Sequence, residues 1–189
     1  MLKSQKPIMK VFFILCLVLL ALALVLSVTR LFKPIGSVAV FTYLKYWLGI
    51  VSALFGGAYV LGGFQKSEAL SYKLFMFLVA LQSVSALLKD LMSTSLNGYE
   101  SPISGILRTI ICVDLVLLAF AKDLGKNTSI GLAAAAFVAE VINDVRLIAL
   151  YGISGQINIA GSIVGISLAL VVFLLVIGKY VNKSERGAK

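Results

Sequence analysis

Ionisable and amide side chains occur inside two of the apolar stretches of this 189-residue chain. They are Arg108 and Asp114 in the stretch 103–121, and Glu140, Asn143, Asp144 and Arg146 in the stretch 130–151. A charge placed in hydrocarbon costs roughly 2.5 to 3.5 kcal/mol on insertion scales, so such side chains face a helix bundle or a wet cavity and often mark ion or solute pathways. These residues are therefore the candidates for chemistry.

Asp114 and Glu140 are predicted to lie level with each other near the middle of a membrane. Counting inward from Ile103 and Tyr151 at about 1.5 Å per residue places both carboxyl groups roughly 16 Å deep. Two carboxylates close together at low dielectric share a proton or hold a cation, because both cannot easily ionise. The pair therefore predicts a site for a proton or a cation.

The same count places Arg108 level with Arg146 and close to Asp144, so we expect an ion pair between Arg108 and Asp144. Arg146, at the side of the polar helix face, is expected to reach outward to the interface. Other polar side chains expected in this half of the bundle are Lys45, Gln82, Lys89 and Asp90. Together they predict an outward-facing vestibule for a small polar or anionic solute. The alternative is that the charges only pair with one another and set the helix register.

The composition indicates that most of the chain lies in a lipid bilayer. The chain is 60% hydrophobic and 13% charged, with a mean hydropathy of +1.04, whereas soluble domains are nearer half apolar and a quarter charged. Six continuous stretches are each long enough to cross about 30 Å of hydrocarbon as a helix. The predicted spans are 11–29, 46–64, 74–92, 103–121, 130–151 and 157–177. The expected fold is an all-α polytopic bundle of six transmembrane helices, in one membrane domain over residues 1–189.

Lysine and arginine indicate the orientation of these spans. If the N-terminus is cytoplasmic, the outer ends hold only Arg30, Lys33, Lys45 and Lys89, and the inner ends hold Lys3, Lys6, Lys10, Lys66, Lys73, Lys122, Lys126, Lys179, Lys183, Arg186 and Lys189. Positive residues prefer the cytoplasmic side, which predicts that both termini are cytoplasmic. The first span is long for a signal peptide and is expected to be retained. The longest outer loop is expected at 93–102. The predicted location of the protein is the plasma membrane of a bacterium.

Small residues recur every four positions in two of the spans. Gly49, Ala53 and Gly57 share one face of the second span, and Gly161 and Gly165 share one face of the sixth. Such faces allow helices to approach closely in a membrane. Packing within the chain is the expected use, and association with a second copy or another membrane protein is the alternative.

Several classes of function are disfavoured. The chain has no histidine, which removes Ser-His-Asp and Cys-His catalysis and imidazole metal ligands. The net charge of +9 does not indicate nucleic-acid binding, because the basic residues collect at the ends of apolar runs. Cys16 and Cys112 both lie within spans, so no disulfide is expected. The sequence predicts no cofactor, no metal site and no catalytic residue.

The size, the six spans and the cytoplasmic termini resemble the substrate-binding subunits of energy-coupling-factor vitamin transporters. Ala21 and Ala23 are the only alanines of the first span, so the Ala-xxx-Ala spacing expected of that family's first helix is missing, and no residue role is taken from the resemblance. The leading hypothesis is a small solute transporter, channel or transporter subunit with a polar path between the third, fourth and fifth spans. The rival is a non-transporting accessory or assembly protein. An enzyme acting on lipid ranks third, because it lacks a motif.

Overall fold

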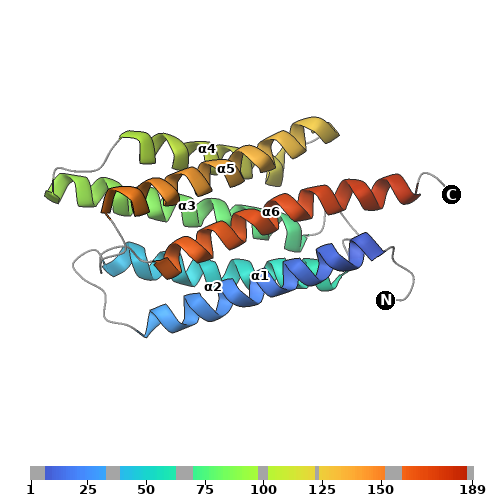
Figure 1. Cartoon of the computed structure of the whole chain (residues 1–189), viewed down its shortest axis with the longest axis horizontal. Coiled ribbons are helices and arrows are strands. Elements are labelled where there is room, and N and C mark those ends of the chain that lie inside the picture. The colour runs from blue at the N-terminus through green and yellow to red at the C-terminus, as the bar shows by residue number, and fades with distance from the viewer. Residues whose placement is uncertain are drawn as a thin grey trace.

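The computed structural model describes residues 7–32, 39–62, 70–97, 102–121, 124–151 and 159–186. These residues form six long helices, which lie side by side in one bundle (Figure 1). The helices are α1 (Pro7–Leu31), α2 (Ala39–Leu61), α3 (Leu70–Asn97), α4 (Pro102–Phe120), α5 (Lys126–Tyr151) and α6 (Ile159–Arg186). The prediction of an all-α chain built from long apolar helices is confirmed.

Five of these helices are long and apolar enough to cross a membrane, namely α1, α2, α3, α4 and α6. The exception, α5, has 26 residues, and its second half carries three charged side chains. Glu140 and Asp144 on it are buried, whereas Val138, Ile142 and Val145 on the opposite side are exposed. This helix therefore turns its polar face inward and an apolar face outward, the reverse of a helix on a soluble protein.

The helices close into a ring. Each packs against its neighbours in the sequence, α1 also packs against α6, and α3 touches α6 (Figure 1). Among the five apolar helices, α6 is the most buried and α1 the least. The outer side of α1 is a stripe of exposed residues that includes Val11, Val18 and Val25. Figure 1 also shows that α1 begins and α6 ends at the same end of the bundle.

Several helices extend beyond the predicted spans. The third helix continues to Asn97, so the outer loop predicted at 93–102 is too long. The turn signal Asn97-Gly98 suggested a loop, but the helix reaches Asn97 because serine and threonine at 93–95 have a helix propensity only modestly below average and tertiary context overrides it. The neighbouring helix, α2, begins at Ala39, seven residues before the predicted span. As a result, Lys45 lies within a helix and not at its outer start.

The small residues of α2 do not all pack. A Cβ added at Gly49 would lie 2.7 Å from the Ser27 Oγ, and one added at Gly56 would lie 2.9 Å from the ring of Phe75. Ala53 is buried between them. A Cβ at Gly57 would meet nothing within 4 Å, so the prediction that Gly57 packs against another helix of this chain is wrong. The close approach runs through Gly49 and Gly56, two turns apart on one face.

Candidate functional site

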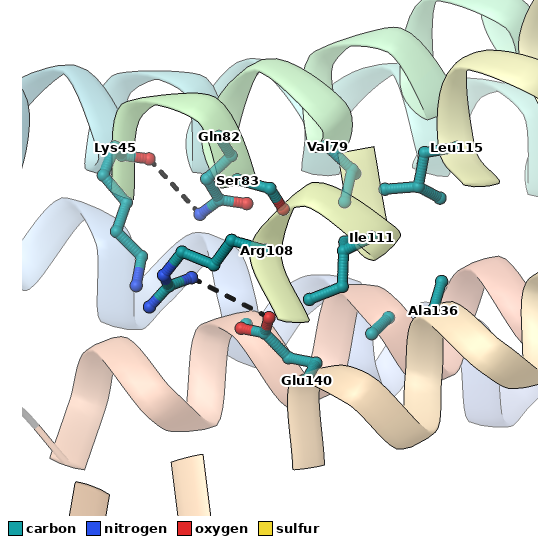
Figure 2. A pocket seen from close by; sticks show the side chains of 11 residues that line it. Lys45, Val79, Gln82, Ser83, Arg108, Ile111, Leu115, Ala136 and Glu140 are labelled. Carbon is teal, nitrogen blue, oxygen red and sulfur yellow. Dashed lines mark hydrogen bonds and ion pairs between the residues drawn. The ribbon is translucent and has the colours of Figure 1, made fainter. Parts of the chain in front are cut away.

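A pocket inside the ring is lined by five of the six helices, α2 to α6. Figure 2 shows the charged and polar side chains that point into it, which are Lys45, Gln82, Ser83, Arg108 and Glu140. Apolar and small residues of α3 to α6 complete the wall. The space open to the centre of a water-sized sphere is about 20 Å³, which is room for about one water molecule.

Arg108 and Glu140 face each other across this pocket (Figure 2). The Arg108 Nη1 lies 3.9 Å from the Glu140 Oε2, and the two side chains are 5% and 7% exposed. This separation is longer than the 2.7 to 2.9 Å typical of a charge-assisted hydrogen bond. The sequence count had paired Arg108 with Asp144, one helical turn from Glu140. Asp144 still interacts electrostatically with Arg108.

Lys45 supplies a second cation. Its amino group enters the pocket from α2 and lies beside the guanidinium of Arg108 (Figure 2). It interacts electrostatically with Arg108, Glu140 and Asp144, and more weakly with Lys89 of α3. Two cations are therefore gathered with two carboxylates, so the cluster is close to neutral when all four groups are ionised.

Hydrogen bonds between α3 and α2 hold the helices that carry these groups. The Gln82 Nε2 donates to the backbone carbonyl of Lys45 at 3.3 Å, and the Ser85 Oγ donates to that of Phe41 at 2.9 Å. Gln82 and Ser85 are both buried. The face of α3 that holds Gln82 and Ser85 is thus directed at α2, and it positions Lys45.

A second polar cluster lies near the start of α4. The Ser104 Oγ donates to the Asn143 Oδ1 at 2.9 Å, and the Arg146 Nη2 donates to the Ser104 Oγ. Asp144, on the same turn of α5, accepts a hydrogen bond from Ser162 of α6. The expectation that Arg146 reaches out to the interface is therefore wrong, because Ser104 offers it an acceptor inside the bundle.

This second cluster is not saturated. Within the part of the chain that the structure describes, the Asn143 Nδ2, the Asp144 Oδ2 and the Arg146 Nε are buried and make no hydrogen bond. Buried polar atoms in native proteins are nearly always paired with protein or water. Such atoms, concentrated in one turn of α5, are typical of a place where water or a polar ligand binds.

Asp114 does not line the pocket. Arg108, Ile111 and Leu115 share the pocket face of α4 at steps of three and four residues, while Asp114 is about 120° around the helix from Arg108. It is 8% exposed, and its Oδ2 has no hydrogen-bond partner among the described residues. Of the two carboxylates predicted to form a pair, the pocket therefore contains Glu140 and not Asp114. Glu140 faces the guanidinium of Arg108 there.

The glycine at position 165 of α6 leaves the space that the Glu140 carboxylate occupies. A Cβ built at Gly165 would overlap the Glu140 Oε1 and would lie 3.2 Å from the Glu140 Cδ. The absence of a side chain on α6 thus admits an acidic side chain from α5. Gly161, the other member of the predicted pair, is buried.

Sequence reasoning missed Ser83, Ser104 and Ser162. Serine is common in membrane helices and carries little information by itself. For Ser104, a signal was present: it precedes Arg108 by four residues, so both occupy the same face of α4.

Comparison with family models, with curated proteins and with solved structures finds no match. In the described ranges, no three cysteine, aspartate or glutamate side chains are grouped to hold a metal ion.

Proposed function

We propose that this chain is a membrane protein that binds a small polar or anionic solute at its centre and passes it across the bilayer, as a transporter, a channel or a subunit of one. The observation that carries the proposal is the pocket shared by Lys45, Arg108 and Glu140 inside a ring of apolar helices. Charged side chains are costly at this depth and are retained mainly where they serve ions or solutes. Buried polar atoms of Asn143, Asp144 and Arg146 that have no hydrogen-bond partner among the described residues extend the polar region toward one end.

The proposal includes α5 as a sixth transmembrane span. Its charges raise its polarity, but its lipid-facing side is apolar, and its buried side meets other polar groups. Six spans place both termini on one side of the membrane, and the distribution of lysine and arginine favours the cytoplasm. The whole chain then forms one domain of the plasma membrane of a bacterium.

A second candidate is an accessory protein that assembles with other membrane proteins and transports nothing. The small size of the pocket, about 20 Å³, favours this candidate, as does the near neutrality of the four charged groups. Charges that satisfy one another set the helix register without any ligand. The open outward side of Gly57 then suits a neighbouring helix of another chain or of a second copy.

Water access distinguishes the two candidates. Ser83 lines the pocket, so Ser83→Cys, in a background where Cys16 and Cys112 are alanine, is the probe for a membrane-impermeant thiol reagent added outside. A transport path that opens exposes this cysteine, and the expected result is slow but complete labelling. No labelling over hours supports the accessory protein.

Two control positions calibrate that experiment. Thr29 is exposed near the end of α1, so Thr29→Cys is expected to react at once. Leu54 is 58% exposed on the lipid-facing side of α2, so Leu54→Cys is expected to stay unlabelled. Asn127, exposed at the start of α5, tests the topology, because Asn127→Cys is expected to react only after the membrane is permeabilised. Labelling of Asn127→Cys in intact cells contradicts the proposed orientation.

Passage itself is measured with purified protein in liposomes. Uptake of labelled anions and small polar solutes is compared with that of liposomes without protein. The proposed function requires uptake of at least one solute, and that uptake is expected to fall at least tenfold in Lys45→Met. The absence of uptake across the panel, in protein that is folded and correctly oriented, contradicts it.

A further inference from the structure

We propose that Glu140 occupies the binding site of a small monovalent anion, and that an anion of halide size enters this site together with one proton that neutralises Glu140. The inference rests on the proposed function and narrows the class of its solute. The site is the pocket between Lys45, Arg108 and Gly165.

The first step is the position of the carboxylate. Glu140 lies between the guanidinium of Arg108 on α4 and the bare backbone of Gly165 on α6. The amino group of Lys45 lies on the same side as the guanidinium (Figure 2). A negatively charged group thus already occupies a site formed by two cations and a glycine. The long separation of 3.9 Å between Arg108 and Glu140 indicates a pair that can be opened.

The volume of the pocket limits the size of the anion. With Glu140 in place, the pocket has room for about one water molecule. Movement of the carboxylate away from Gly165 frees the volume of that group. A halide ion fits such a space, whereas an organic solute of several heavy atoms does not. The expected solute class therefore narrows from small polar or anionic molecules to single-atom or similarly compact anions.

The charged groups around Glu140 determine what its protonation does to the net charge of the site. The titratable or charged groups that face or act on Glu140 are Lys45 of α2, Arg108 of α4 and Asp144 of α5, with Lys89 of α3 acting through Lys45. From α6, Gly165 offers no side chain. Among the groups that act on one another here, Lys45 and Arg108 carry two positive charges and Glu140 and Asp144 two negative ones, while Arg146 bonds to Ser104 in the neighbouring cluster. Protonation of Glu140 leaves one positive charge in excess, and an uncompensated charge is expensive in a buried site.

One anion restores this balance. A proton from solution binds the Glu140 carboxylate, the contact between Arg108 and Glu140 opens, and the anion then lies against Arg108 and Lys45. The total charge of the site is the same before and after the exchange. Because each ligand favours the state that the other stabilises, proton and anion bind with positive coupling, and the coupling is reciprocal. The geometry points to an electroneutral uptake of one proton with one anion.

The test is the pH dependence of chloride binding. The whole protein, purified in detergent, is titrated with sodium chloride against sodium gluconate between pH 5 and 8, and the chloride Kd is taken from the shift of the unfolding temperature. With one proton bound for each chloride, the Kd is expected to rise about tenfold per pH unit over the range in which the chloride-free site does not already hold that proton. A chloride Kd that does not change with pH overturns the inference, and so does the absence of chloride binding.

The variant Glu140→Gln carries a permanently neutral side chain of the same shape. It is expected to bind chloride with a Kd independent of pH and close to the tightest value of the unchanged protein. The matched control is Asp114→Asn, which alters a buried carboxyl outside the pocket and is expected to keep the tenfold slope. A slope retained in Glu140→Gln overturns the inference. If this variant does not fold, the slope of the unchanged protein still decides.

Liposomes separate this inference from the proposed function. An inward chloride gradient is expected to acidify the interior, as read by an internal pH-sensitive dye, and Glu140→Gln is expected to pass chloride without acidification. Passage of solute with no proton movement overturns the coupling while the transport function stands. Binding of chloride with the expected pH slope, but with no passage of any solute, supports the site and contradicts transport.

Discussion

The carboxylate of Glu140 lies against Gly165, in the space that any side chain at position 165 would fill. The Gly-xxx-Gly spacing of α6 suggested helix packing, yet at this position the missing side chain accommodates a charged group of the neighbouring helix. The same carboxylate faces Arg108 on its other side. A single residue of α5 is thus held between α4 and α6, and the following predictions test this arrangement.

Gly165→Ala is expected to destabilise the protein. The added methyl group overlaps the Glu140 carboxylate, and overpacking of a filled interior costs typically about 1 to 3 kcal/mol. The free energy of unfolding is measured by titration with sodium dodecyl sulfate in mixed micelles. The matched control is Gly57→Ala, where the methyl group meets nothing within 4 Å, and where the gain in helix propensity predicts a stabilisation of about 0.5 to 1 kcal/mol. Equal effects of the two substitutions would contradict the structure.

Arg108→Met is expected to cost about 3 kcal/mol, the lower end of the range for breaking a buried ion pair, because Lys45 remains beside Glu140. In the double variant Arg108→Met with Glu140→Gln, the carboxylate that faced Arg108 is replaced by a neutral amide, and more than half of that loss is expected to be regained. The unfolding free energies of the two single variants and the double variant form a thermodynamic cycle. Strict additivity of the two substitutions would show that the pair makes no energetic contact.

Ser104→Ala removes the hydroxyl that joins Arg146 to Asn143. Both partners are then left with one further unsatisfied polar atom, so a loss of about 1 to 3 kcal/mol in unfolding free energy is expected. Thr109→Ala is the control, because its hydroxyl bonds only to the Gly105 carbonyl on the exposed side of the same helix. The effect of Thr109→Ala is expected to stay within about 0.5 kcal/mol. A larger effect at Thr109 than at Ser104 would be inconsistent with the hydrogen bonds described.

Asp114→Asn is expected to leave solute passage unchanged, because Asp114 does not line the pocket. Its buried oxygen has no hydrogen-bond partner among the described residues, so removal of the charge is expected to be neutral for stability or to add up to about 2 kcal/mol. Uptake into liposomes and unfolding in mixed micelles measure the two effects. Loss of uptake in Asp114→Asn, at unchanged stability, would support a site formed by both Asp114 and Glu140.

The number of helices and their approximate positions follow from the sequence, because continuous apolar runs admit few alternatives. The inward face of α5 was also predictable, since Glu140, Asn143 and Asp144 recur at three- and four-residue steps. Its burial agrees with that reading, as each of these residues is at most 5% exposed. Helix ends were less predictable, because serine and threonine at the end of α3 are compatible with either helix or loop.

Pairing between helices was the part that sequence reasoning did not resolve. Counting residues gives depth to within about one turn, but the tilt and rotation of each helix are set by packing. The sequence predicted Asp144 as the partner of Arg108, whereas the structure pairs Arg108 with Glu140, one helical turn away. Hydropathy is also uninformative about rotation when both the interior and the lipid are apolar. For this reason the four-residue spacing led to Gly57, whereas the close contact is made at Gly56.

The closure of the ring by α1 and α6 has a consequence for biogenesis. Helices are synthesised from the N-terminal side, so α6, the most enclosed of the apolar helices, follows the other five described helices. Until it arrives, Glu140 lacks the glycine surface against which it rests and Asp144 lacks Ser162. A chain that stops after α5 therefore leaves two acidic groups of that helix without the surface that α6 provides.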